Sequence, residues 1–115
     1  MHNFKELKVW QKARVLVKDI YHLTKQLPDD EKYGLVSQMR RASLSIPSNI
    51  AEGTGRSTDK EFVRFLDIAV GSSFELETQL ILCLDLDFIA ENNFNELEVK
   101  VQEIQRMIHS LKTKF

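Results

Sequence analysis

The chain has 115 residues, of which 43% are hydrophobic and 29% are charged, and its formal net charge is -1. A domain of this length buries roughly two-thirds of the surface that its unfolded chain exposes, so it needs no disulfide or metal to fold. The near-zero charge removes the overall basic surplus that nucleic-acid binding usually needs, and two prolines and four glycines are too few for a disordered tail.

The single cysteine and the short apolar runs argue against a disulfide-bonded, secreted or membrane-spanning protein. Cys83 is the only cysteine, which excludes an intrachain disulfide, and its apolar neighbours predict a buried thiol. The segment from Met1 to Lys5 lacks the apolar region of a signal peptide, and no apolar run is long enough to span a membrane. We therefore expect one cytoplasmic domain over residues 1–115, without a membrane partner.

Apolar residues that recur alternately three and four positions apart predict helices with one inward face. The first such stripe predicts a helix over residues 4–26, which Pro28 ends. The second predicts a helix over residues 31–54, and because its phase continues through Pro47 we expect one kinked helix rather than two. The first stripe is Val9, Ala13, Leu16, Ile20, Leu23 and Leu27, and the second is Leu35, Met39, Ala42, Ile46, Asn49 and Gly53.

Two further stripes predict helices over residues 59–88 and 94–113. Thr58, Asn93 and Asn3 each precede a Glu by three residues, which is the capping-box pattern of a helix start. Short connections favour antiparallel neighbours, so we predict an all-α, up-down-up-down four-helix bundle. The third stripe is Phe62, Leu66, Ala69, Ser73, Leu76, Leu80 and Cys83, and the fourth is Phe94, Leu97, Val101, Ile104, Ile108, Leu111 and Phe115.

Small and polar residues gather on the second and third predicted helices. Antiparallel pairing of these helices brings Arg41 and Glu75 to similar heights, where a bidentate contact is reasonable. With Asn49 and Glu52 they predict a polar network inside the bundle or between protomers, and an active or ligand site is the less favoured interpretation. The small residues that would let the backbones approach are Ala42, Ser43, Ser45 and Ser48 on one side and Ala69, Gly71, Ser72 and Ser73 on the other.

Patterns typical of metal and phosphate sites are missing from the sequence. The Glu-x-x-His pairs that a di-metal bundle site needs do not occur. The segment Gly53-Thr54-Gly55-Arg56 follows a predicted helix and lacks the spacing of a P-loop or of a dinucleotide fingerprint. We therefore expect no catalytic residues, no cofactor, no metal and no small-molecule substrate.

Basic residues provide the candidate nucleic-acid contacts. Lys8 and Lys12 lie on the outward side of the first predicted helix, and Arg40 and Arg41 lie on the second. These side chains could contact phosphate. Acidic residues elsewhere balance them, and a charged run is usually a solvated face, so RNA contact is one of two open interpretations.

Several strings carry a resemblance to a known family, and they cover roughly residues 4–90 of the chain. The most specific is Ile46-Pro47-Ser48-Asn49-Ile50-Ala51-Glu52-Gly53. On these strings the chain resembles the four-helix bundle proteins that are encoded within intervening sequences of bacterial 23S ribosomal RNA genes. The other strings are Leu7-Lys8-Val9-Trp10-Gln11-Lys12-Ala13, Tyr33-Gly34-Leu35, Gln38-Met39-Arg40-Arg41-Ala42, Arg64-Phe65-Leu66, Gly71-Ser72 and Glu75-Leu76-Glu77-Thr78-Gln79-Leu80.

The resemblance implies a ring of five bundles without an assigned catalytic activity. Relatives in fold include the accessory variability protein of diversity-generating retroelements, which works with a reverse transcriptase and nucleic acid and is strongly basic, unlike this chain. One hypothesis is therefore a ring-forming module that associates with ribosomal or other RNA through Lys12, Arg40 and Arg41. The alternative is a protein-interaction scaffold without direct nucleic-acid contact, for which a nucleic-acid-processing protein would be one partner.

Overall fold

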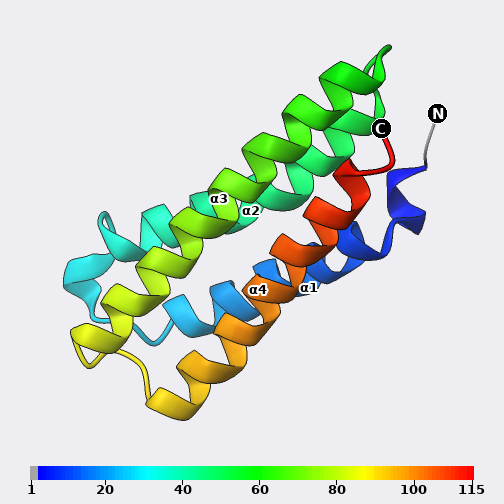
Figure 1. Cartoon of the computed structure of the whole chain (residues 1–115). Coiled ribbons are helices and arrows are strands. Elements are labelled where there is room, and N and C mark those ends of the chain that lie inside the picture. The colour runs from blue at the N-terminus through cyan, green and yellow to red at the C-terminus, as the bar shows by residue number, and fades with distance from the viewer. Residues whose placement is uncertain (1–2) are drawn as a thin grey trace.

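The computed structural model describes residues 3–115, and it is a bundle of four long helices. These are α1 (Lys8–Thr24), α2 (Leu35–Thr54), α3 (Asp59–Asp85) and α4 (Glu91–Lys112), with two short 3-10 helices, η1 (Phe4–Glu6) and η2 (Asp29–Glu31). Consecutive long helices run in opposite directions, and η1, the α2–α3 turn and the C-terminus gather at one end (Figure 1). The predicted all-α four-helix bundle is confirmed.

The helices form a four-cornered arrangement. α1 contacts α2 and α4, and α3 contacts the same two helices from the opposite corner. The bundle measures 43 × 25 × 19 Å. With 27 residues α3 is the longest of the four helices, and its length of about 40 Å spans nearly the whole bundle.

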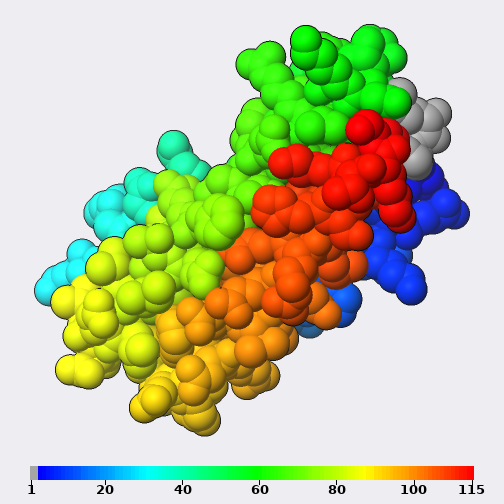
Figure 2. Space-filling model, in the orientation of Figure 1, coloured from blue at the N-terminus to red at the C-terminus, as the bar shows by residue number. Residues whose placement is uncertain are grey.

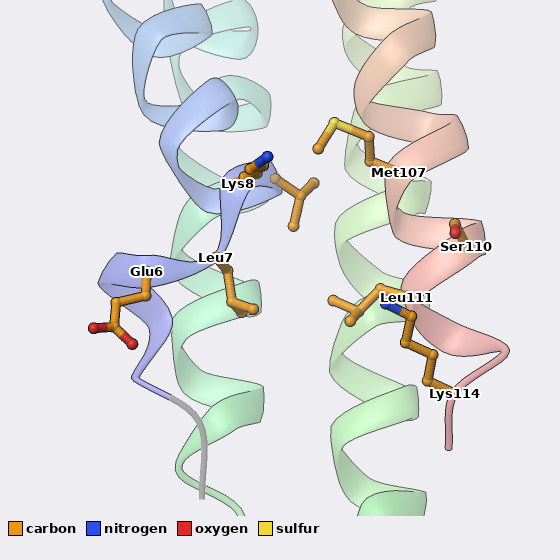
Figure 3. Close-up of a pocket in the computed structure, with 8 residues that line it drawn as sticks. Glu6, Leu7, Lys8, Met107, Ser110, Leu111 and Lys114 are labelled. Atoms are coloured by element: carbon orange, nitrogen blue, oxygen red, sulfur yellow. The ribbon is translucent and has the colours of Figure 1, made fainter.

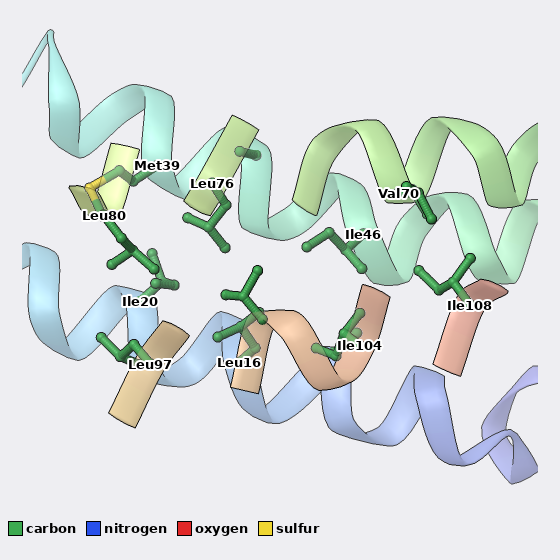
Figure 4. Close-up of a cluster of buried hydrophobic side chains, with 14 of the residues drawn as sticks. Leu16, Ile20, Met39, Ile46, Val70, Leu76, Leu80, Leu97, Ile104 and Ile108 are labelled. Carbon is green, nitrogen blue, oxygen red and sulfur yellow. The ribbon is translucent and has the colours of Figure 1, made fainter. Parts of the chain in front are cut away.

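The core lies along the bundle axis, where apolar side chains from all four helices meet (Figure 4). Every residue of the third predicted stripe is buried, from Phe62 to Cys83. In the second stripe, Asn49 is only half-buried and the neighbouring Ile50 is fully buried. The fourth stripe is buried from Phe94 to Ile108 and becomes exposed towards Phe115.

Small residues bring α2 and α3 close together, as their sequence predicts. The Ser45 and Ser72 hydroxyl groups share a hydrogen bond of 2.7 Å between the two helices. A Cβ atom added at Gly53 would lie 2.8 Å from Cδ1 of Phe62 and 2.9 Å from Cβ of Phe65. Gly53 therefore allows the end of α2 to approach the start of α3 more closely than any other residue would.

Two of the three predicted caps differ from the structure. Oγ1 of Thr58 accepts a hydrogen bond of 3.1 Å from the backbone N–H of Glu61, which confirms the start of α3. Asn3 caps η1 rather than α1, because the chain is extended at Leu7 and α1 begins only at Lys8.

The Asn93 cap is wrong, since α4 begins at Glu91 after Ala90, which makes no side-chain cap. The cause lies in the preceding turn. Asp87 takes a left-handed φ of 60°, which ends α3, and Ile89 is then buried in the core. α4 therefore starts directly after this anchor.

α2 runs from Leu35 to Thr54 with Pro47 inside it, so the single helix expected here is confirmed. Its start is four residues later than predicted, because Asp29–Glu31 forms η2 and Gly34 leaves helical geometry with φ -110° and ψ -111°. The kink at Pro47 stays a prediction.

Candidate interaction surface

α3 carries a second stripe on the side that faces away from the core. Its apolar members, with 40% to 53% of each side chain exposed, are Ile68, Phe74, Ile81, Leu82 and Leu86. Exposed residues between Asp67 and Leu86 recur three and four positions apart, which places them along one side of the helix. We call this set the outer α3 stripe, and its full membership is Asp67, Ile68, Gly71, Phe74, Glu75, Thr78, Ile81, Leu82, Asp85 and Leu86.

The outer α3 stripe is acidic as well as apolar. Its charged members are Asp67, Glu75 and Asp85, and it contains no Lys or Arg. Asp67 forms an ion pair with Lys112 of α4. α3 and α4 together form the face of the molecule that is turned towards the reader in Figure 2. Large apolar side chains between acidic ones make this a surface that favours a partner over water.

The predicted polar network does not form as one cluster within a single copy of the chain, and a network between protomers stays a prediction. Within the described residues Arg41 and Glu75 form no ion pair, and both side chains are exposed. Nδ2 of Asn49 donates to the carbonyl oxygen of Ser45, at 2.8 Å. Glu52 pairs with Arg56, one turn further along, at 3.5 Å. Each group is thus satisfied locally or by solvent.

A hydrogen-bond network that the sequence patterns did not indicate lies two residues away from Glu75. The two carboxylate oxygens of Glu77 accept hydrogen bonds from Nε2 of Gln102, at 3.1 Å, and from Nε2 of Gln105, at 2.9 Å. Gln105 is buried, so its amide depends on this partner. Their positions in the sequence could have indicated this contact, because Glu77 directly follows the core residue Leu76 and Gln105 directly follows the core residue Ile104.

The four candidate nucleic-acid contacts are split between two parts of the surface. Nζ of Lys12 forms an ion pair of 3.2 Å with Glu103 of α4. Lys8 is exposed and borders a hollow of about 300 Å³ between the start of α1 and the end of α4, into which Leu7 and Leu111 project (Figure 3). Both lysines thus lie on the α4 side of α1.

Arg40 and Arg41 lie on α2 and differ in their surroundings. The Arg40 guanidinium stacks 4.4 Å from the ring centre of Tyr21, and its Nε donates to Oγ1 of Thr24 at 2.9 Å. Arg41 is exposed, and no described side chain pairs with it. Arg40 therefore joins α2 to α1, and of the two arginines only Arg41 is free to meet a partner.

A second hollow of about 360 Å³ opens between η1, α1 and α2. Apolar side chains dominate its walls, and Arg14 lies beside it with its guanidinium 5.6 Å from the ring centre of Trp10. We call it the α1–α2 groove. Its lining residues are Phe4, Trp10, Arg14, Val17, Leu44, Pro47, Ser48 and Ala51.

Residues 3–115 contain no group of three His, Cys, Asp or Glu side chains that could hold a metal ion. Over the same range, none of the helices combines the length and apolar content of a membrane span.

Cys83 is buried, and this burial, with a smaller contribution from the Glu31 carboxylate, raises the pKa of its thiol to about 11. Its Sγ donates to Sδ of Met39, 3.5 Å away, so the thiol is packed as a core group.

Comparison with known proteins agrees with the observed fold and with the family resemblance that the sequence strings indicated. The family model of the 23S rRNA-intervening sequence protein matches residues 5–110. The chain belongs to this family. It is also similar to a solved structure, a protein from the S23 ribosomal protein family of Bacteroides thetaiotaomicron, with a TM-score of 0.84 and 25% sequence identity over 90% of this chain and 97% of that one. No curated protein matches the chain.

Proposed function

We propose that the chain is a non-catalytic module that assembles with copies of itself through the outer α3 stripe. The observation that carries this proposal is the exposure of Ile68, Phe74, Ile81, Leu82 and Leu86 on one side of the longest helix. Exposed apolar side chains at helical spacing lower the free energy of association when a partner removes them from water. The family resemblance suggests five copies in a ring.

The length of the stripe suits a stable contact. From Ile68 to Leu86 it runs for about 27 Å along the helix. A standard interface buries about 800 Å² on each partner, which a helix of this length and its flanking residues can supply. The bundle offers this surface without rearrangement, because α3 is held in place by its buried stripe on the opposite side.

The placement of the polar residues supports a structural role over a catalytic one. Arg41, Asn49, Glu52 and Glu75 do not converge on one point, so they cannot act together on one substrate atom. The half-buried carboxylate of Glu77 accepts hydrogen bonds from two glutamine amides. We expect purified protein to bind itself and to turn over no substrate.

Light scattering on a size-exclusion eluate tests the assembly. The wild type should elute at about five times the 13.4 kDa of one chain. Leu82→Glu places a charge in the stripe and should give a monomer. Val99→Glu is the matched control, since Val99 is an equally apolar, 62% exposed residue on α4, and it should leave the mass unchanged. A wild-type monomer would refute the proposal.

RNA association is a second candidate function, and the observation that favours it is the exposed, unpaired Arg41. A ring repeats each such residue, and several weak phosphate contacts to one RNA strengthen each other. Protein from cells lysed without nuclease should then elute with nucleic acid that high salt removes, and Arg41→Ala should reduce it more than Arg106→Ala, a change at an exposed arginine on α4. A protein peak free of nucleic acid would favour the protein-interaction scaffold.

A further inference from the structure

We infer that the α1–α2 groove of one copy receives the outer α3 stripe of the next copy, in a head-to-tail contact. This inference rests on the proposed self-assembly and adds the second half of the interface. The stripe supplies a ridge of apolar side chains on a helix, and the groove supplies an apolar hollow between two helices. Ridges that enter grooves are the way in which helices pack against each other inside proteins.

The groove has the chemistry to cover this ridge. Leu44 is 43% exposed at its wall, and Pro47, Ala51, Val17 and the ring of Trp10 complete an apolar lining. The volume of about 360 Å³ admits several apolar side chains. The groove and the ridge belong to the same chain. A second copy of this chain can therefore cover the ridge, and no other protein is needed.

The charges around the two surfaces are complementary. Arg14 lines the groove and Lys18 follows it by one turn on α1, and both cations are exposed. Glu52, the nearest acidic residue of α2 on this side, is already paired with Arg56. The groove therefore presents a cationic rim.

The stripe presents the opposite sign. Glu75 and Asp85 are exposed and have no ion-pair partner among the described residues, while Asp67 is paired with Lys112. A stripe placed against the same stripe of a second copy would set these carboxylates against each other. A stripe placed in the groove sets them near Arg14 and Lys18. Complementary charge thus favours the head-to-tail contact over a symmetric one.

A head-to-tail contact leaves each copy with one free ridge and one free groove until the chain of copies closes on itself. Because the two surfaces differ, single changes in each of them distinguish a head-to-tail contact from a symmetric one. Leu44→Glu disables the groove and leaves the ridge intact, whereas Leu82→Glu disables the ridge and leaves the groove intact. Leu44 and Leu82 are 43% and 44% exposed in one copy, so neither change should unfold the bundle, and circular dichroism with a thermal melt checks this.

The two variants are measured alone and as an equimolar mixture by native mass spectrometry. Each alone should be monomeric, and the mixture should give a one-to-one dimer, because the mixture retains one intact ridge and one intact groove that match. In the mixture of Leu82→Glu with Val99→Glu, whose α4 change touches neither surface, Val99→Glu should keep the wild-type assembly and Leu82→Glu should stay monomeric, because a closed assembly leaves no ridge free.

The remaining outcomes separate this inference from the proposed assembly. If Leu44→Glu keeps the wild-type mass while Leu82→Glu is monomeric, the assembly stands and the groove is not its partner surface. If both variants are monomeric but their mixture yields no dimer, the two surfaces do not meet and the inference is wrong. If the wild type itself is monomeric, the proposed assembly fails and this inference fails with it.

Discussion

Gly53 lies directly against the ring of Phe62, where the end of α2 meets the start of α3. A Cβ at this position would be 2.8 Å from Phe62, whose side chain is fully buried, and 2.9 Å from Cβ of Phe65, which the backbone fixes. Neither neighbour can move without disturbing the core. The contact explains why the end of α2 carries glycine at this position.

Gly53→Ala should therefore destabilise the bundle by about 1 to 3 kcal/mol, since overpacking exceeds the gain in helix propensity. Gly71→Ala is the matched control, because a Cβ there meets no described atom within 4 Å, and it should stabilise α3 by about 0.5 to 1 kcal/mol. Urea unfolding in a Leu82→Glu background separates fold stability from assembly. Equal effects of the two changes would contradict the close contact.

Glu77 should matter to the fold, and Glu75 should not. Glu77→Ala leaves the buried amide of Gln105 without its partner and should cost about 1 to 3 kcal/mol. Glu75→Ala removes an exposed carboxylate without a partner and should change stability by less than about 0.5 kcal/mol. Urea unfolding of both variants, in the same monomeric background, checks the contrast. A larger loss at Glu75 would restore the polar network that the sequence suggested.

Replacing Arg40 should destabilise the bundle, whereas replacing Arg41 should not. Arg40→Ala removes the contact with Tyr21 and the hydrogen bond to Thr24 that join α2 to α1, and we expect a loss of about 1 to 2 kcal/mol. Arg41→Ala should leave the melting temperature nearly unchanged, since Arg41 is exposed. A thermal melt of each variant measures this. Equal melting temperatures for the two variants would show that Arg40 is not a structural residue.

The Cys83 thiol predicts a loss of stability at alkaline pH. Its pKa rises from 9.0 to about 11 on folding, so the folded state keeps a proton that the unfolded state has released. The contribution is fully present below pH 9 and is lost as the pH rises towards 11; it amounts to about 2 to 3 kcal/mol. Between these pH values the unfolding free energy of the wild type should fall more steeply than that of Cys83→Ala. Parallel curves would contradict the protonated, buried thiol.

The four helices and the core could be predicted from the sequence, because a helix with one buried face carries apolar residues at a regular spacing. The stripe from Phe62 to Cys83 was assigned in full, since every member faces one axis. The start of α4 was not, because it depends on the left-handed Asp87 and on the burial of Ile89, which only the assembled bundle determines.

The candidate site was predictable only as a region. The small residues of α2 and α3 indicated close approach, and the Ser45–Ser72 hydrogen bond confirms it. Glu75 and Glu77 differ by a rotation of about 200° around α3, and only the position of α4 decides which of the two carboxylates binds to it. The outer α3 stripe could not be assigned from the sequence, because only the assembled bundle shows that Ile68 and Leu82 lie outside its core.

The mass of the wild-type protein over a dilution series is the most direct test of self-assembly through the outer α3 stripe. Multi-angle light scattering should give one discrete mass near five times 13.4 kDa that persists on dilution, and Leu82→Glu should give 13.4 kDa throughout. A wild-type mass of 13.4 kDa at every concentration would contradict the account, because the outer α3 stripe would then be exposed without a copy to cover it.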